Sequence, residues 1–380
     1  MKRPATVAAV GWLFLAACGR VDYDSLGRRQ ALAAGQAHTC AIARGRLLCW
    51  GANADGQLGL GDAQDRTLPE AVDERLDWSQ VTTGARHTCA LRLGGQLACW
   101  GANDRGQLGV GDTTPRSRPT PVALPAPAVA ISTSFDHTCA RLTDGTIACW
   151  GENLEGQLGL GVLPDGPPVL VPTPPDLDGC SDVACGQGHT IALQGGRLMG
   201  SGRNTADELG LGDSALGQYL TFVPIDDGAW SRVAAGQNMS CGIRTDGELS
   251  CWGTNAYGSL GTGDLLSRTV PTPAATAGPW GDLAVNTFHG CALRTDGHLF
   301  CWGRNTEGQL GTGDNVDRLQ PVETGSDTDD WAAVSTGRFH SCAQRSDGTV
   351  FCTGVNLGGE LGLGDLVSRA TWTEVRLPRP

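Results

Sequence analysis

The residues with the clearest capacity for chemistry are histidines and cysteines that recur together along the chain. A His-x-Cys motif is followed by a second cysteine nine or ten residues after the first, as in His87, Cys89 and Cys99. Imidazole and thiolate groups are zinc ligands, whereas two cysteines alone can form a disulfide. Which chemistry applies depends on how the chain positions these residues.

The motif belongs to a repeat of about fifty residues. The first cysteine of each copy, with Ile191 in its place in the fourth, marks the repeats at positions 40, 89, 139, 191, 241, 291 and 342. A repeat of this length buries its apolar faces by stacking on its neighbours. The narrow range of steps, 49 to 52 residues, therefore predicts seven stacked units of one structure.

Each repeat has the pattern of strands and turns. In the third copy, Thr143-Asp144-Gly145 is typical of a three-residue hairpin loop, which places Cys139 opposite Cys149. A proline-marked segment and a further short apolar strand raise the number to about four strands per repeat, with both faces of the hairpin covered. The sequence therefore predicts an all-β fold, a seven-bladed β-propeller with about four strands per blade.

The pattern H-x-C-A…DG…CWGxNxxGQLGxGD, repeated seven times over residues 31–380, resembles the regulator-of-chromosome-condensation repeat. This resemblance implies a seven-bladed propeller whose ring closes by pairing of the N- and C-terminal segments in one blade. Thr371 to Leu377 would then meet Ala31 to Gly35. Such closure hides edge strands. The activity of the family's nuclear member, guanine-nucleotide exchange on a small GTPase, is a function that the resemblance implies.

Disulfides are favoured over zinc for the repeated cysteines. Directly opposed strand residues have Cα atoms ~4.5 to 5.5 Å apart, within the disulfide range of ~4.4 to 6.8 Å. The fourth copy replaces both partners together, by Ile191 and Gly200, and the fifth has Met239 in place of histidine but keeps both cysteines. We therefore predict no metal site. The predicted disulfides are Cys40–Cys49, Cys89–Cys99, Cys139–Cys149, Cys180–Cys185, Cys241–Cys251, Cys291–Cys301 and Cys342–Cys352.

The first residues form a separate export signal. Lys2 and Arg3 precede an apolar run that ends at Ala17 and is too short to span a bilayer as a helix. The run ends in Leu-Ala-Ala-Cys, which resembles the bacterial lipobox, so Cys18 is predicted to be lipidated. We expect a signal peptide at residues 1–17, a tether at 18–30 and the propeller at 31–380. An ordinary cleaved signal peptide is the alternative.

Charge and composition exclude several classes of function. The chain is 40% hydrophobic, with 56 glycines and 20 prolines, which fits a turn-rich globular protein. Removing residues 1–17 takes Lys2 and Arg3 away and leaves 26 basic against 40 acidic side chains, a formal charge of −14 instead of −12. No basic run is present, so nucleic acid is not expected as a partner.

The motifs that suggest catalysis or cofactors also have structural explanations. Six of the seven histidines occupy one repeated position, which favours packing, and His298 has no nucleophile that can be assigned to it. The glycines at 56–61 are followed by no Lys-Ser or Lys-Thr, and the loop at 53–56 lacks the closing glutamate of a calcium site. We expect no enzyme activity and no cofactor.

Function is then expected where the copies differ. The fourth copy carries Tyr219 and Phe222 in a polar linker, and an acidic loop contains Asp327, Asp329 and Asp330. Aromatic residues on a rigid scaffold suit binding hot spots, so these five residues are the candidate partner-binding residues. We expect a monomeric binding scaffold for a protein or a saccharide, attached to the bacterial envelope only by its lipid. Nucleotide exchange on a GTPase is the alternative.

Overall fold

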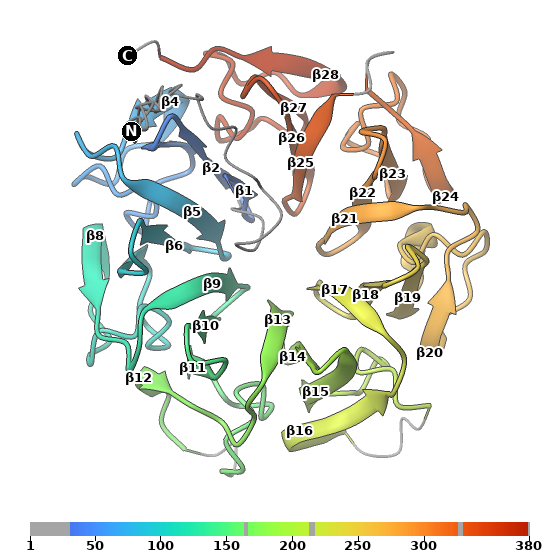
Figure 1. Cartoon of the computed structure of the whole chain (residues 1–380). Helices are drawn as coiled ribbons and strands as arrows, with labels where there is room; N and C mark the ends of the chain where they lie inside the picture. Colours follow the sequence, from blue (N-terminus) through green and yellow to red (C-terminus); the bar gives the residue numbers. More distant parts are fainter. Residues whose placement is uncertain (1–30, 163–165, 213–216, 326–329, 379–380) are drawn as a thin grey trace, which may run out of the picture.

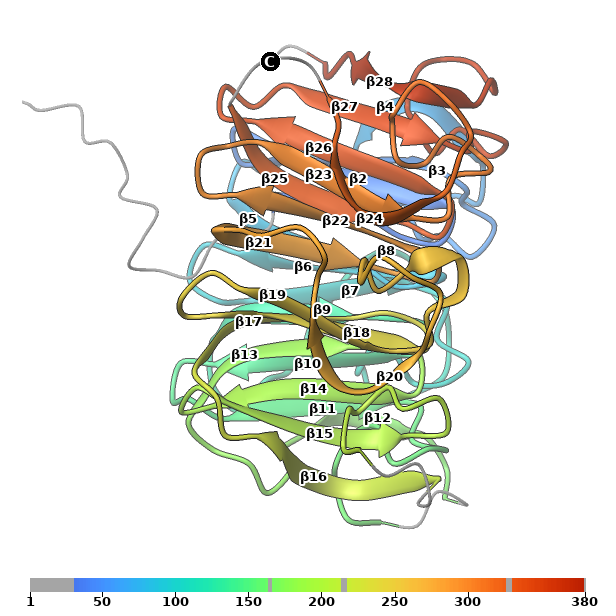
Figure 2. The ribbon, with the colours of Figure 1, turned by 90° about the vertical axis from the view of Figure 1, so that its right-hand side faces the viewer.

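The computed structural model describes residues 31–162, 166–212, 217–325 and 330–378, and the predicted signal peptide, Cys18 and tether lie outside these residues. The described residues form seven four-stranded antiparallel sheets arranged as blades around a central axis (Figure 1). Figure 2 shows that the strands of the blades run between the two faces of the ring. The predicted seven-bladed β-propeller is confirmed.

Each blade contains four consecutive strands, numbered from the axis outward. Blades 1 and 2 comprise β1 (Leu32–Ala34), β2 (His38–Ala43), β3 (Arg46–Gly51), β4 (Arg66–Ala71), β5 (Trp78–Thr83), β6 (His87–Arg92), β7 (Leu97–Gly101) and β8 (Arg116–Val122). Blades 3 and 4 comprise β9 (Ala128–Thr133), β10 (His137–Leu142), β11 (Ile147–Gly151), β12 (Val169–Thr173), β13 (Cys180–Cys185), β14 (His189–Gln194), β15 (Arg197–Arg203) and β16 (Gln218–Asp226). Blades 5 and 6 comprise β17 (Trp230–Ala235), β18 (Met239–Arg244), β19 (Leu249–Gly253), the 3-10 turn η1 (Ala256–Gly258), β20 (Arg268–Pro273), β21 (Trp280–Val285), β22 (His289–Arg294), β23 (Leu299–Gly303) and β24 (Arg318–Glu323). Blade 7 comprises β25 (Trp331–Thr336), β26 (His340–Arg345), β27 (Val350–Gly354) and β28 (Arg369–Val375).

The central hairpin of each blade has the register that its turn predicts. In blade 3, Cys139 pairs with Cys149 and Thr138 pairs with Trp150. Every residue of β11 is buried, whereas no residue of β12 is fully buried. The two middle strands therefore supply the core, and the outer strand supplies the rim.

Six hairpins carry a disulfide between directly opposed cysteines. The Cα atoms of each pair are 4.1 Å apart, and all twelve cysteines are buried. Blade 4 places Ile191 opposite Gly200 at the same position. Six blades are thus stapled across their middle strands, and blade 4 is held by packing.

The predicted Cys180–Cys185 disulfide is wrong. The two cysteines are the first and last residues of the same strand, β13, and both thiols are free and buried. Five steps along an extended strand separate Cα atoms by roughly 16 Å, far beyond the reach of a disulfide. A five-residue spacing is compatible with a disulfide in a tight turn, but here it falls within a strand.

The ring closes in a different way from the expected pairing of chain ends. Strand β1 pairs with β2 in blade 1, and β28 pairs with β27 in blade 7, so neither terminal blade combines the two ends. Blades 7 and 1 meet through side chains and single hydrogen bonds. The Ala34 amide donates to Ser335 Oγ at 2.9 Å, and the Arg338 amide donates to the Gly35 carbonyl. Among the described residues, no helix has the length and apolar character that crossing a membrane requires.

Candidate functional site

The repeated histidines lock neighbouring blades together. At the joint between blades 2 and 3, His87 Nε2 lies 3.1 Å from Thr138 Oγ1, and this hydroxyl donates to the Gln107 carbonyl at 3.0 Å. Trp150 Nε1 donates to the same carbonyl at 3.0 Å. The corresponding pairs, 2.8 to 3.1 Å apart, are His38–Thr88, His87–Thr138, His137–Thr190, His189–Ser240, His289–Ser341 and His340–Thr39.

Burial keeps these imidazoles neutral. Desolvation lowers the pKa of His38, His87, His137 and His289 to about 3, and the pKa of His189 and His340 to about 4. A group that stays neutral across the physiological range and bonds to a structural hydroxyl is unsuited to general acid–base catalysis. The one joint without the pair, between blades 5 and 6, has Met239 and Gly290 in the two positions, so both partners are lost together.

Each blade joint also has a slot for one aromatic ring. The indole of Trp150 lies on Gly109 of the preceding blade, where a Cβ atom would come within 2.6 Å of Nε1. Gly109 also has a positive φ of 70°, which favours glycine. The equivalent tryptophans, 50, 100, 150, 252 and 302, are fully buried.

Phe222 fills this slot in blade 4. Ser201 stands where five of the other blades have tryptophan, and its Oγ donates to the Gln157 carbonyl at 3.3 Å. The ring of Phe222, from the outer strand β16, lies on Gly159, at 2.5 Å from the position of a Cβ atom there. Tyr219 is also half-buried, against the core between blades 4 and 5. Phe222 therefore has a packing role at this joint, and a partner-binding role for the half-buried Tyr219 and Phe222 stays a prediction.

Replacing Phe222 by alanine is expected to lower the free energy of unfolding by about 2 kcal/mol, since a half-buried ring would leave a gap at the joint. The exposed Thr221 on the same strand gives the matched control, and Thr221→Ala is expected to change stability by less than about 0.5 kcal/mol. Chemical denaturation with the disulfides intact measures both values. Equal effects of the two changes would contradict the packing role.

The other sequence-predicted site residues are dispersed. Asp330 forms an ion pair with Arg345 at 3.5 Å, while Asp327 and Asp329 lie outside the described residues. His298, the histidine outside the repeat, lies with Nδ1 at hydrogen-bond distance, 2.6 Å, from Glu323 Oε1. The structure brings none of these described residues together with Tyr219 or Phe222 in one site.

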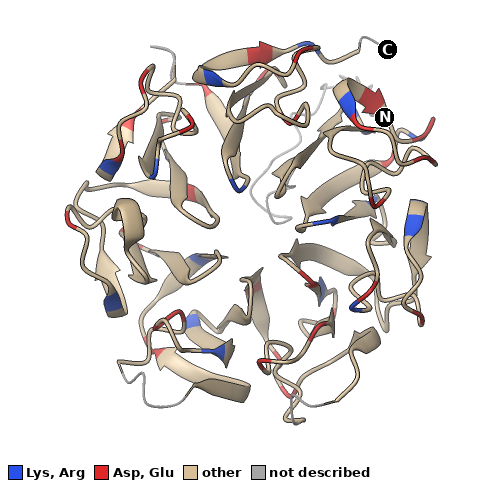
Figure 3. Ribbon diagram, turned by 180° about the vertical axis from the view of Figure 1, so that it is seen from behind, with Lys and Arg blue, Asp and Glu red and all other residues tan. Residues whose placement is uncertain are grey.

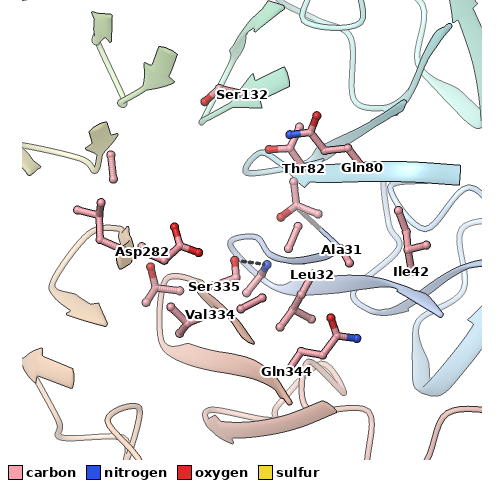
Figure 4. Close-up of a pocket in the computed structure, with 18 of the residues that line it drawn as sticks. Ala31, Leu32, Ile42, Gln80, Thr82, Ser132, Asp282, Val334, Ser335 and Gln344 are labelled. Atoms are coloured by element: carbon pink, nitrogen blue, oxygen red, sulfur yellow. Dashed lines mark hydrogen bonds between the residues drawn. The ribbon is translucent and has the colours of Figure 1, made fainter. Parts of the chain in front are cut away.

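A central channel of about 1790 Å³ runs along the inner strands (Figure 4). Its wall includes the charged residues Asp182, Arg232 and Asp282, which occupy equivalent positions in blades 4, 5 and 6. The Asp182 carboxylate accepts hydrogen bonds from the amides of Val183 and Val233, and burial raises its pKa to about 6. The bond to Val233 joins two inner strands, so this charge serves the contact between blades 4 and 5.

The two faces of the ring differ in construction. We call the side with the long loop after the third strand of each blade the loop face, and the side with the turn between the second and third strands the turn face. In the described residues, acidic and basic positions are interspersed around the ring (Figure 3).

Charged side chains dominate the loop face of blades 1 to 4. Arg86 pairs with Asp55 at 3.3 Å and with Asp104 at 2.8 Å, which connects blades 1 and 2. Burial raises the pKa of Asp136 and of Glu152, and neighbouring carboxylates add to both shifts. The charged groups of this face therefore interact in part with one another.

An aromatic–arginine cluster occupies the loop face of blades 5 to 7. It consists of Tyr257, Phe288, Arg304, Arg338 and Phe339. Phe288 and Phe339 stack with ring centroids 5.9 Å apart, and Tyr257 meets Phe288 edge-on at 5.8 Å. The Arg304 guanidinium lies 5.2 to 5.4 Å from all three ring centroids, and that of Arg338 lies 5.0 Å from Phe339.

The cluster is built from positions where the repeats differ. The residue before the repeated histidine, or before Met239, is Ala37, Arg86, Asp136, Gly188, Asn238, Phe288 and Phe339 in blades 1 to 7. Tyr257 has a positive φ of 63°, which is unusual for a tyrosine, and its side chain is 42% exposed. Strained backbone tends to accompany functional sites. The sequence analysis missed this cluster, and aligning the repeats on their histidines would have revealed the two phenylalanines.

Seven blades built from one repeated sequence and closed into a ring define a repeat β-propeller. The chain matches the model of the RCC1-like domain over residues 17–276 and the regulator of chromosome condensation (RCC1) repeat over residues 296–344. It belongs to the RCC1-like family.

Similar proteins agree with this assignment. The ultraviolet-B receptor UVR8 of Arabidopsis thaliana is 35% identical over 359 residues, which cover 91% of this chain and 70% of the receptor. The mouse X-linked retinitis pigmentosa GTPase regulator is 33% identical over 93 residues, 23% of this chain and 9% of that protein. Human WBSCR16 superposes with a TM-score of 0.79 at 22% identity, covering 88% of this chain and 94% of that one. Yeast RCC1 (Prp20), solved bound to Kap60, gives 0.78 at 20% identity, with 99% and 91% coverage. The two solved structures show the shared fold.

Proposed function

We propose that this protein is a non-enzymatic, exported binding scaffold that holds a protein partner on its loop face, centred on the aromatic–arginine cluster. Tyrosine and arginine are enriched at the centres of protein interfaces, where truncating a few residues removes most of the affinity. The stacked rings and Arg304 are held by a rigid ring of blades, so little ordering is required on binding. This cluster is the observation that carries the proposal.

A protein fits the cluster better than a saccharide does. Phe288 and Phe339 turn their ring faces toward each other, with an interplanar angle of 21°, and Arg304 lies against both rings. The surface offered to a partner therefore consists of ring edges, guanidinium groups and the exposed Tyr257. Such groups suit the carboxylates, carbonyls and side chains of a protein surface.

Export and anchoring form part of the same proposal. Six buried disulfides favour an oxidising compartment. We infer that Cys18 carries a lipid which anchors the propeller in the bacterial envelope, at the periplasmic or the surface side of the outer membrane. An envelope partner is then the natural target, and the cytosolic GTPases that nucleotide exchange would require are in another compartment.

The binding proposal is tested by crosslinked affinity capture from living cells with the tagged full-length protein. The double variant Phe288→Ala/Phe339→Ala is expected to lose capture of the partner by about tenfold or more, as hot-spot truncation costs about 2 kcal/mol or more. The control carries Leu76→Ala and Leu93→Ala, two exposed leucines of the turn face. This control is expected to capture the partner as the unaltered protein does.

The identity of the captured molecule separates the alternatives. One envelope protein, captured in stoichiometric amount and lost with the cluster variant, supports the proposal. Capture of a small GTPase that is lost with the cluster variant would overturn the binding-scaffold proposal in favour of nucleotide exchange. Capture of an envelope glycan that is lost in the same way would show that the partner is a saccharide and not a protein. Equal capture by both double variants would contradict the assignment to the loop face. A Cys18→Ala chain, released from the envelope fraction, tests the anchor.

A further inference from the structure

The free thiol of Cys185 faces a disulfide of the neighbouring blade. Its Sγ, the Sγ of Cys139 and a ring nitrogen of His137 all lie within 4.8 Å of one another, and all three residues are buried. Cys139 is bonded to Cys149 in the hairpin of blade 3. Because the Cys139 sulfur is engaged in that bond, the three groups are a thiol beside a disulfide and not a set of three free metal ligands.

This arrangement occurs at one of the seven blade joints. The residues equivalent to Cys185 in the other inner strands are Ala34, Thr83, Thr133, Ala235, Val285 and Thr336. The thiol also belongs to the one blade without a hairpin disulfide, where Ile191 lies opposite Gly200. Blade 4 therefore lacks a staple of its own but presents a cysteine to the staple of blade 3.

The position of the thiol is fixed by blade 3. The Cys185 amide donates to Ser132 Oγ at 3.0 Å, and the thiol donates to the Ser132 carbonyl at 3.4 Å. Ser132 belongs to β9, which pairs with β10 and places Ser132 directly beside Cys139. Blade 3 therefore holds the Cys185 sulfur within 4.8 Å of the Cys139 sulfur.

We propose that Cys185 exchanges with the Cys139–Cys149 disulfide and forms an alternative disulfide, Cys139–Cys185, between blades 3 and 4. The Cys185 thiolate attacks the Cys139 sulfur, a new S–S bond forms, and the bond to Cys149 breaks. The electron pair leaves with the Cys149 sulfur, which takes up the proton lost by Cys185. The reaction is an isomerisation, so it consumes no external oxidant or reductant.

The two disulfides have different structural consequences. Cys139–Cys149 spans 10 residues within one hairpin. Cys139–Cys185 would span 46 residues (185 minus 139) and would join two blades whose contact is otherwise non-covalent. In chain-entropy terms the longer loop restricts the unfolded chain more. The exchange thus replaces a disulfide within one hairpin by a disulfide between blades 3 and 4.

Exchange in the folded protein is expected to be slow. Burial raises the pKa of the Cys185 thiol to about 12, so the reactive thiolate is scarce at neutral pH. The neighbouring His137 has its pKa lowered to about 3 and is a weak base. The hairpin disulfide is therefore expected in newly folded protein, and the joint disulfide is expected to accumulate when the joint opens.

The geometry is tested with the Cys149→Ser variant, which leaves Cys139 as a free thiol. Oxidation of the folded variant with diamide is expected to link Cys139 to Cys185, which peptide mapping identifies and intact mass shows as the loss of two hydrogens. The double variant Cys149→Ser/Cys185→Thr cannot form the link. Threonine is chosen because Thr83 and Thr133 occupy the equivalent position in blades 2 and 3. Cys149→Ser/Cys180→Ala keeps it, because Cys180 lies at the far end of β13. A folded Cys149→Ser protein that retains its other five disulfides and forms no such link overturns the proposal.

The exchange itself is tested in the unaltered chain by trapping the released thiol. Under mild denaturant, a maleimide is expected to label Cys149 in the unaltered protein, together with appearance of the Cys139–Cys185 peptide pair. In Cys185→Thr both signals are expected to disappear. Equal labelling of Cys149 in the two proteins, or labelling without the new peptide pair, would show that Cys149 is released by another route and would refute exchange.

Discussion

Lowering the pH from about 7 to about 5 is expected to reduce the free energy of unfolding by several kcal/mol. The six buried histidines have their pKa lowered to about 3 or 4 in the folded protein, whereas an exposed histidine titrates near 6.5. Below about pH 6.5 the unfolded chain therefore binds protons that the folded ring excludes, and stability falls with pH. Each histidine would contribute about 2 kcal/mol of this loss at about pH 5.

Buried carboxyl groups oppose this effect in part. Burial raises the pKa of Asp182 to about 6 and raises that of Asp136, Glu152 and Glu360. The folded state binds these protons first, so such groups add stability as the pH falls. The histidines outnumber the groups with large opposing shifts, and the net direction is a loss of stability on acidification.

Urea unfolding at several pH values, with disulfides intact, measures the number of protons taken up. The matched variant is His137→Met/Thr190→Gly, which copies the residues Met239 and Gly290 of the joint between blades 5 and 6. Its stability is expected to depend less steeply on pH, by about one proton. A pH-independent free energy of unfolding between about pH 7 and 5 would mean that the histidines do not exclude protons in the folded state.

Replacing Trp100 by alanine is expected to cost about 3 to 5 kcal/mol of stability. The indole is fully buried between blades, its Nε1 donates to the Gln57 carbonyl at 2.9 Å, and it packs edge-on against Trp78. Alanine would leave a cavity that the rigid blades cannot fill by moving together. It would also remove one of the two donors to the Gln57 carbonyl, the other being the Thr88 hydroxyl.

Two comparisons make the tryptophan experiment specific. Trp100→Phe keeps most of the volume and loses the hydrogen bond, so a smaller loss of about 1 to 2 kcal/mol is expected. Leu93→Ala, at an exposed leucine of the same blade, is expected to stay within about 0.5 kcal/mol of the unaltered protein. Chemical denaturation followed by fluorescence gives all three values. A loss below about 1 kcal/mol for Trp100→Ala would contradict the role of the slot.

The repeat made the architecture predictable from sequence. The fifty-residue period, the hairpin turn and the loss of both cysteines together in the fourth copy depend on local spacing, and they led to the blades and to the pairing of Cys139 with Cys149. The packing role of the histidines followed because they recur at one position. Their partners, such as Thr138, lie in the next blade and could be identified only after the blades were stacked.

Features that combine separate segments escaped the sequence analysis. Phe222 occupies a slot left by Ser201 on another strand of the same blade. The aromatic–arginine cluster draws its side chains from three blades. The predicted disulfide between Cys180 and Cys185 was wrong because spacing alone does not distinguish a turn from a strand. The predicted pairing of the two chain ends in one blade was wrong because it was taken from the family resemblance and not from the residues.

The way in which the ring closes determines how it would respond to a pulling force. Each blade is one continuous segment, and the first and last blades meet through side chains and single hydrogen bonds. Tension between the two chain ends would load this contact first, without a ladder of strand hydrogen bonds to resist shear. Blades 7 and 1 would separate there first, while six of the blades would keep their disulfides and remain individually folded. A propeller of this design would yield first at the contact between its first and last blades.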